Sequence, residues 1–380
     1  MARGVDMDDA ETGPEGVTRR RVLFLSSSVL LSSTLVNTQG RSDGPDTGAR
    51  LTPWQTGARG IDVHHHFVPP GYLAAMGAAA LGGGNGGGVK EWTPQRSLES
   101  MDKYGVETAI TSISLGVETP DPAQRSRLCR DCSEYGAKMV AQYPKRFGLF
   151  APLPLPDVDA SLKELSYALD MLKADGIGLS SHYGDGMYLG DPAFDPVMEE
   201  MNRRKVVTFV HPKNTGVRVP QSPGSQYINT PELPNDSTRA IFNLLGHGTT
   251  ERYPDIKFIW PHGGGTSVFM LSRFAWSLSA QGDFAPVYAK LKKAMSSFYY
   301  DLALTVSPST IKAIREIAPA SNVLLGSDYP YAGDPARSMG QVFAELPHIG
   351  LKDTELLGVV RKNADALFPR LKNTSDVTRR

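Results

Sequence analysis

From Gly60 onward, short apolar runs alternate with stretches whose apolar residues recur at helical spacing. Strands that are buried on both faces read as nearly continuous apolar runs, whereas amphipathic helices repeat apolar residues every three or four positions. The alternation is typical of βα units built around a parallel sheet. It predicts eight strands, at residues 60–67, 107–114, 147–152, 176–182, 206–211, 256–262, 298–304 and 322–328.

The stretches between these runs predict helices. Ser309 follows a proline, and Asp353 precedes a periodic apolar run, so both suit helix starts. Eight strands with helices between them predict a single (β/α)₈ TIM barrel rather than an open doubly wound sheet, because no G-x-G-x-x-G follows the first strand. The predicted helices are 122–142, 160–174, 195–204, 237–245, 267–278, 309–317 and 353–367.

Four of the predicted strands end in motifs rich in histidine or aspartate. They are D-V-H-H-H at 62–66, F-V-H-P at 209–212, P-H-G-G-G at 261–265 and G-S-D-Y-P at 326–330. Side chains alternate between the two faces of a strand, so His64 and His66 are expected to share one face while His65 points the other way. The carboxyl ends of the strands are where parallel barrels collect their catalytic groups.

We therefore predict a metal-dependent active site at these strand ends. His262 would lie beside the ion as a proton-transfer group. A histidine triplet on an exposed loop is the alternative, but the place of all four motifs at strand ends favours the metal site. The predicted ligands are His64, His66, His211 and Asp328.

Composition narrows the range of partners. Forty Lys and Arg residues balance forty Asp and Glu residues, so no basic field is present to attract nucleic acid, and a small-molecule substrate is expected. Cys129 and Cys132 form a C-x-x-C within a predicted helix, without the second pair of ligands that a structural zinc site requires. We expect them to pack in the helix, with a redox pair as the alternative.

The first fifty residues differ from the rest of the chain. Three arginines at 19–21 precede an apolar and serine-rich stretch at 24–36 and a polar run at 37–50. This pattern predicts a twin-arginine signal and a periplasmic or secreted protein. A disordered leader on a cytoplasmic protein is the alternative, because no clear A-x-A cleavage site follows. The apolar stretch is too short to span a membrane comfortably, and no later segment comes near that length.

The chain is thus expected to comprise a leader at 1–50, the barrel at 51–370 and a polar tail at 371–380. Two insertions interrupt the barrel pattern. The Gly- and Ala-rich stretch at 77–88 predicts a mobile loop above the site, and the Pro- and Gly-rich stretch at 213–234 predicts a lid or an interface.

The strand-end motifs, together with N-A-D-A-L-F-P at 363–369, resemble those of the amidohydrolase superfamily. Within it they are similar to the branch of 2-amino-3-carboxymuconate-6-semialdehyde decarboxylase and 6-methylsalicylate decarboxylase. The resemblance covers about 60–369. It implies zinc at the four predicted ligands, with Mn²⁺ possible, and an acid/base role for His262. Asp328 is the alternative proton donor.

The resemblance implies a non-oxidative decarboxylase of a small aromatic or unsaturated carboxylic acid, such as a 6-methylsalicylate-like hydroxybenzoate. A metal-dependent lactone or amide hydrolase is the alternative, since the same ligand set serves both reactions. A catalytically inactive barrel that binds a ligand or stabilises an assembly is the third possibility. Binuclear members of the superfamily bridge their metals with a lysine that ends the fourth strand. Here that strand carries none, so a single ion is expected. His182 ends the same strand and suits either a pocket or a structural role.

Two basic residues are candidates for binding the substrate carboxylate. Arg273 lies eleven residues after His262, where the branch carries an arginine that reaches into the neighbouring subunit's site. The match implies a homodimer, and a surface or helix-capping arginine is the alternative. Lys90 is an approximate substitute for a substrate-binding arginine that the muconate semialdehyde enzymes carry near this point. That departure favours a simpler aromatic acid.

Overall fold

The computed structural model of the protein describes residues 59–77, 87–184, 186–213, 229–280, 282–331 and 336–372. The predicted leader, most of the two predicted insertions and most of the polar tail lie outside these residues. The twin-arginine signal therefore stays a prediction from the sequence.

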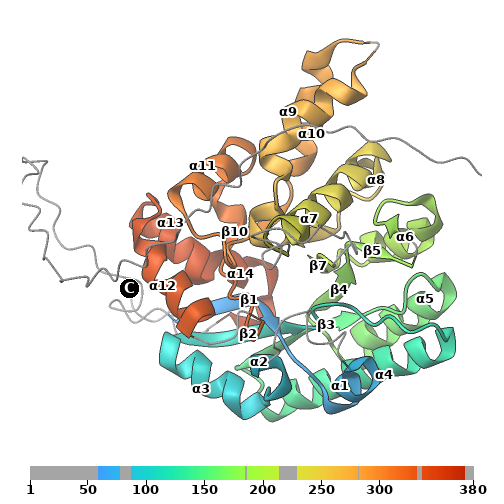
Figure 1. The fold of residues 1–380 in the computed structure, drawn as a ribbon, viewed down its shortest axis with the longest axis vertical. Helices are drawn as coiled ribbons and strands as arrows, with labels where there is room; N and C mark the ends of the chain where they lie inside the picture. The colour runs from blue at the N-terminus through green and yellow to red at the C-terminus, as the bar shows by residue number, and fades with distance from the viewer. Residues whose placement is uncertain are drawn as a thin grey trace, which may run out of the picture. The chain divides into compact units, whose positions relative to one another are not determined.

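Eight parallel strands form one sheet, in which neighbours follow the order of the chain. The predicted (β/α)₈ barrel is confirmed (Figure 1). A separate antiparallel hairpin, β5 (His182–Tyr183) and β6 (Met187–Tyr188), follows the fourth strand. The barrel strands are β1 (Gly60–His66), β2 (Val106–Ser112), β3 (Phe147–Pro152), β4 (Gly176–Ser180), β7 (Val207–His211), β8 (Lys257–Trp260), β9 (Tyr299–Asp301) and β10 (Val323–Leu324).

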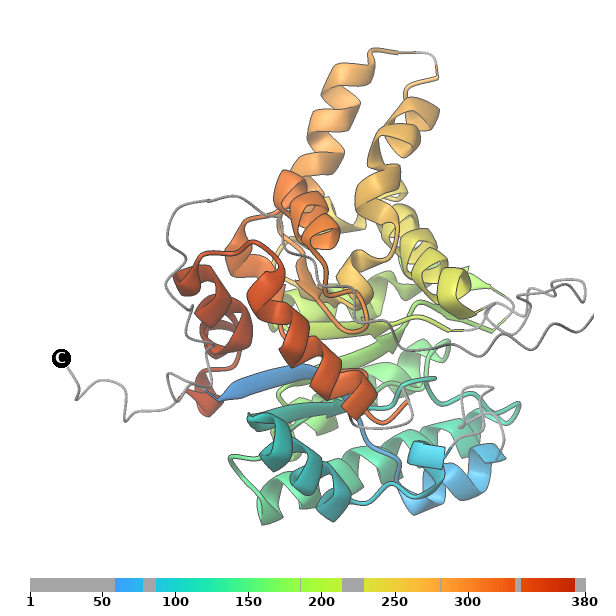
Figure 2. The same cartoon turned by 60° about the vertical axis from the view of Figure 1, so that its left-hand side comes forward.

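Helices surround the strands, and α9 and α10 pack against each other and project away from the others (Figure 1 and Figure 2). The predicted helix at 122–142 is confirmed at both ends, whereas α3 and α10 were not predicted. The α-helices are α1 (Pro70–Met76), α2 (Gly87–Lys90), α3 (Pro94–Tyr104), α4 (Pro122–Gln142), α5 (Val158–Ser166), α6 (Asp195–Arg203), α7 (Asn229–Gly246), α8 (Thr249–Arg252), α9 (Ser267–Leu278), α10 (Phe284–Met295), α11 (Pro308–Ile317), α12 (Gln341–Glu345), α13 (Asp353–Leu357) and α14 (Asn363–Leu367).

Six of the eight predicted strands were too long at their carboxyl ends, among them 256–262, 298–304 and 322–328. The last residue of each of these three predictions has a backbone that an extended strand cannot contain. His262, Leu304 and Asp328 have φ values of 54°, 55° and 61°, which lie in the left-handed region. For non-glycine residues this conformation is uncommon, and it often marks a functional site.

Hydrogen bonds between β1 and the segment after β10 close the barrel. Val63 N donates to Leu325 O at 2.9 Å, and Asp328 N donates to His64 O at 2.8 Å. Apolar side chains from the strands fill the barrel interior, among them Ile61, Ile110 and Phe209.

Asp62 reinforces this closure. Its carboxylate is fully buried, at a point where β1 shifts register against β2. Asp62 Oδ1 accepts hydrogen bonds from His64 N at 3.0 Å and from Ser327 N at 3.1 Å. Its Oδ2 accepts from Ser327 Oγ at 2.6 Å. One side chain therefore joins the first strand to the segment that follows the last.

Cys129 and Cys132 are buried in α4 and unpaired. Burial raises the pKa of both thiols, which disfavours the reactive thiolate and agrees with a packing role.

Over the described residues, none of the helices has the length and apolar character needed to cross a membrane.

Replacing Asp62 should destabilise the barrel. In Asp62→Ala the two amides and the hydroxyl lose a buried acceptor, so the free energy of unfolding should fall by roughly 3 kcal/mol. Urea denaturation followed by circular dichroism would measure it. As a control, Asp121→Ala removes one exposed N-cap hydrogen bond of α4 and should cost about 1 kcal/mol. An equal loss in both variants would contradict a special role for Asp62.

Candidate metal centre

Four side chains from three places in the barrel meet at the carboxyl ends of the strands. His64 and His66 come from the end of β1, His211 ends β7, and Asp328 follows β10. Each offers one potential ligand atom, and these atoms lie within 4.8 Å of one another. All four side chains are buried. The structure therefore brings the predicted ligands together in one cluster.

The two histidines of β1 share one face, as the alternation predicts. Their Nε2 atoms are 3.1 Å apart, and Asp328 Oδ1 lies 3.2 Å from His64 Nε2 and 3.1 Å from His66 Nε2. His65 points away from the cluster. Its Nε2 lies 3.0 Å from Ser97 Oγ, and its ring stacks on Tyr329 with centroids 4.7 Å apart. His65 is thus buried and takes a packing role.

The donor set fits a metal ion. His211 Nδ1 donates to Pro212 O at 2.8 Å, which leaves the lone pair on Nε2, and this buried Nε2 has no hydrogen-bond partner among the described residues. An unsatisfied buried acceptor is unfavourable unless a ligand completes it. A divalent ion at about 2.1 Å from the imidazole nitrogens would do so.

Each cluster histidine is also held in orientation through its other ring nitrogen. His66 Nδ1 lies 3.0 Å from Ser112 Oγ, and His64 Nδ1 lies 3.0 Å from Asp301 Oδ2. With Nδ1 engaged, Nε2 faces the cluster in all three imidazoles. Such outer contacts typically fix the tautomer and direction of metal-binding histidines.

Asp301 was not identified from the sequence. It ends β9, is fully buried, and its Oδ1 accepts hydrogen bonds from His262 N at 3.1 Å and from Ala303 N at 2.9 Å. The only signal in the sequence was a carboxylate within the predicted strand 298–304. Asp301 therefore connects a predicted ligand with the predicted proton-transfer group, because it orients the ring of His64 and fixes the backbone of His262.

The electrostatics of the cluster favour a cation. Burial alone would lower the pKa of His64, but the carboxylates of Asp301 and Asp328 raise it to about 10. Burial lowers the pKa of His66 to about 4 and also holds that of His211 well below its usual value. Burial would raise the pKa of Asp328, yet His64 and the other histidines hold it well below the usual range. Two neutral imidazoles and an ionised carboxylate are therefore available as ligands, and the positive charge that Asp301 and Asp328 stabilise on His64 is one that a divalent ion would supply in place of the proton.

His262 lies beside the cluster. Its Nε2 is 3.6 Å from Asp328 Oδ2, and its ring centroid is 5.0 Å from that of His64. The three following glycines all have positive φ. A Cβ at Gly264 would lie 2.8 Å from the Tyr300 ring, and one at Gly265 would lie 2.0 Å from Pro234 O. The P-H-G-G-G motif thus permits the tight turn that holds His262 at the strand end.

A cavity of about 660 Å³ opens at His262 and Asp328. Two of its lining residues carry buried polar atoms without partners among the described residues, His262 Nδ1 and Thr305 Oγ1. Its other lining residues come from the start of α7, the loop after β9, and the segment from Tyr331 to α12. They are Thr230, Leu233, Pro234, Leu304, Val306, Tyr331, Ser338, Gln341, Val342 and Glu345.

The other predicted site residues lie apart from this cavity. Lys90 is exposed on α2, and Arg273 is exposed on α9. His182 Nδ1 lies 3.3 Å from Asp236 Oδ1, and His182 is not among the residues that line the cavity. His247 and His348 are exposed. Within the described part of one chain, no lysine or arginine lines the cavity.

The fold and the cluster define a (β/α)₈ barrel with a site suited to a divalent metal ion. A sequence profile of the amidohydrolase family matches residues 61–370. The chain belongs to the amidohydrolase family.

Similar proteins include two fungal decarboxylases. Decarboxylase macB of Penicillium terrestre is 34% identical over 325 residues, which cover 82% of this chain and 95% of the relative. The 6-methylsalicylic acid decarboxylase of Penicillium expansum is 34% identical over 333 residues, or 83% and 98% of the two chains. Among solved structures, a dihydroxybenzoic acid decarboxylase from Polaromonas sp. JS666 with bound manganese has a TM-score of 0.71 and 19% identity, over 83% of this chain and 98% of that chain. At this identity the structural likeness concerns the fold.

Asp301→Asn should weaken metal binding. Losing the charge behind His64 should lower the affinity for zinc by about 10- to 100-fold, a range typical of such outer contacts. Competition with a chromophoric chelator would measure it. The control Asp175→Asn alters a carboxylate that accepts from Leu149 N and from Arg370, and it should leave the zinc affinity unchanged. Wild-type affinity in Asp301→Asn would contradict the orienting role.

Proposed function

We propose that the protein is a metal-dependent non-oxidative decarboxylase of a small aromatic carboxylic acid, a hydroxybenzoate similar to 6-methylsalicylate. The observation that carries the proposal is the buried cluster of three histidines and one aspartate, which opens with His262 onto a cavity large enough for such a ligand. The names of the similar fungal proteins support the same reaction class.

His64, His66, His211 and Asp328 would hold one ion in this proposal. Three imidazoles and a carboxylate suit zinc, and Mn²⁺ is the alternative, supported by the manganese of the structural neighbour. When bound, the ion supplies positive charge that fixes and polarises the oxygen atoms of the substrate. A single ion is proposed because β4 ends at Ser180 and is followed by Ser181 and His182, with no lysine to bridge a second ion.

The remaining task of the site is to deliver one proton. Protonation of the ring carbon that bears the carboxylate interrupts the aromatic system. Cleavage of the bond to the carboxylate carbon then returns its electron pair to the ring and releases carbon dioxide. His262 and Asp328 both line the cavity, where a substrate ring can lie against them, and His262 Nε2 is 3.6 Å from Asp328 Oδ2. We assign the donor role to His262, because Asp328 is ionised and is kept as a ligand of the ion; Asp328 is the alternative donor.

Hydrolysis of a lactone or an amide is the second candidate, since the matched family is named for hydrolases and the ligand set serves both reactions. The two reactions leave different products. Carbon dioxide from 6-methylsalicylate supports the decarboxylase, whereas turnover of lactones without decarboxylation of any hydroxybenzoate reverses the order.

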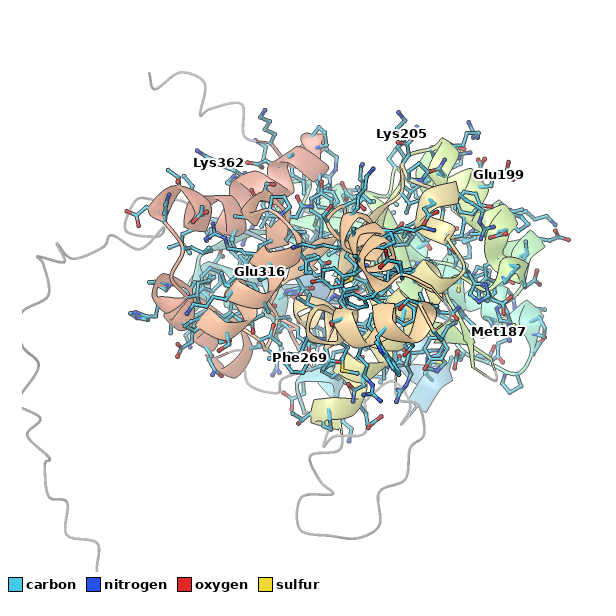
Figure 3. The ribbon with its side chains drawn as sticks, turned by 90° about the horizontal axis from the view of Figure 1, so that it is seen from above. Met187, Glu199, Lys205, Phe269, Glu316 and Lys362 are labelled. Atoms are coloured by element: carbon cyan, nitrogen blue, oxygen red, sulfur yellow. The ribbon has the colours of Figure 1, made fainter. Side chains whose placement is uncertain are left out.

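We also propose that two chains form a homodimer through α9. Phe269 is 86% exposed and Trp276 is 71% exposed, and Arg273 lies between them on the same helix face. Figure 3 shows Phe269 at the outside of the molecule. Exposed aromatic residues around an arginine are typical of interface centres.

The proposed dimer would supply the cationic side chain that the described cavity of a single chain lacks. The Arg273 side chain makes no ion pair or hydrogen bond with any residue that the structure describes. The described lining of the cavity offers a carboxylate substrate no lysine or arginine. Arg273 from a second copy would provide a bidentate partner for that carboxylate. Lys90, exposed on α2, is the weaker candidate for the same role.

His262→Ala should retain the metal and lose at least about 100-fold in turnover of 6-methylsalicylate, because a positioned proton donor is absent. His211→Ala should lose the metal itself, since it removes a ligand. Elemental analysis and carbon dioxide release would measure the two effects. His247→Ala, at an exposed histidine, is the control and should change neither. Equal metal loss in the first two variants would show that His262 is a ligand.

Arg273→Ala should raise KM for carboxylate substrates by roughly 10- to 100-fold, the effect of losing a charged hydrogen bond. Trp276→Asp should convert dimers to monomers in sedimentation velocity and raise KM to a similar extent, because it removes the partner's arginine. Lys293→Ala, at an exposed residue of α10, is the matched control. A monomeric wild-type protein with full activity would contradict the shared site.

A further inference from the structure

The cavity beside the metal centre, called the channel below, is lined along one helical face by residues that differ in burial. The continuous segment of η7 (Ala336–Gly340) and α12 contributes residues that lie three, four and seven positions apart. Ser338 and Val342 are buried, whereas Gln341 and Glu345 are exposed. His262 and Asp328 are buried too, so the channel has a buried side at the metal centre and an exposed side, its mouth, at Gln341 and Glu345.

Aliphatic side chains from three different elements line this channel. Leu233 comes from α7, Val306 from the loop after β9, and Val342 from α12. Leu304 stands at the mouth, 53% exposed, with its backbone in the left-handed region. An apolar ligand group in this cavity would cover the exposed Leu304 side chain and remove its apolar surface from water.

The volume exceeds what the proposed substrate needs. A cavity of roughly 150 Å³ accommodates benzene, and this one, at about 660 Å³, is about four times larger. Its size lies in the range of about 300–1,000 Å³ that encloses larger organic ligands. A hydroxybenzoate with its carboxylate at the metal centre and a single methyl substituent would leave the aliphatic part of the channel without contacts.

We propose that the substrate is a 2-hydroxybenzoate whose ring carries an apolar substituent of several carbon atoms, and that Val306, Val342 and Leu304 bind this substituent along the channel. The inference rests on the proposed function and deepens it. The carboxylate and the ring hydroxyl stay at the metal centre, and the chain length of the substituent becomes the property that the channel selects.

The test uses the metal-loaded, full-length enzyme and 2-hydroxybenzoates with methyl, propyl and pentyl groups at ring position 6. Carbon dioxide release gives kcat/KM for each. Each methylene that the channel buries should raise kcat/KM by up to about fourfold. In Val342→Phe, which narrows the channel, the ratio of pentyl to methyl kcat/KM should fall at least about tenfold. The control Ala344→Phe places the same ring on an exposed position of α12 and should keep the wild-type ratio.

The outcomes separate the two proposals. A series that rises with chain length, and flattens in Val342→Phe, supports the inference. A flat or falling series with measurable turnover of the methyl compound overturns the inference alone, and would mean that the partner chain or another group occupies the channel. If no hydroxybenzoate releases carbon dioxide, the proposed function fails and the inference fails with it. The wild-type series is decisive even if Val342→Phe does not fold.

Discussion

The hydrogen bonds that close the barrel are the interaction on which the candidate site depends. His64 and His66 belong to the first strand and Asp328 follows the last, so these ligands meet only when the two ends of the sheet are joined. The 2.8 Å hydrogen bond from Asp328 N to His64 O does this directly. Asp62 joins the same two ends of the sheet by accepting a hydrogen bond from Ser327 N, 265 positions away in the sequence. Closure of the fold and assembly of the cluster are therefore the same event.

A second constraint is charge in a buried space. Several imidazoles and two carboxylates, Asp301 and Asp328, are removed from water at the carboxyl ends of the strands. Such groups are costly to bury unless they are paired, hydrogen-bonded or bound to a metal. Each histidine of the cluster uses Nδ1 for a protein contact and turns Nε2 inward, and the Nε2 of His211 is left without a partner among the described residues. A cation bound between the three Nε2 atoms and the Asp328 carboxylate would give these buried groups a common partner.

Much of the fold and the cluster could be predicted from the sequence because both depend on local patterns. Apolar runs located the strands, and alternation placed His64 and His66 on one face. Asp62 and Asp301 were missed because their roles come from contacts with residues more than two hundred positions away. Strand ends were predicted too long because a left-handed residue such as His262 has no clear signal in an apolar run. The placement of Arg273 outside its own cavity follows from the projection of α9, which a single sequence does not reveal.

The central claim is that the three imidazoles and Asp328 bind one ion together. X-ray absorption spectroscopy of the protein loaded with one equivalent of zinc tests it most directly. The account predicts a single site with three imidazole ligands at about 2.0–2.1 Å and a first shell completed by oxygen. A spectrum with at most one imidazole, or zinc that is removed by simple buffer exchange, would contradict it.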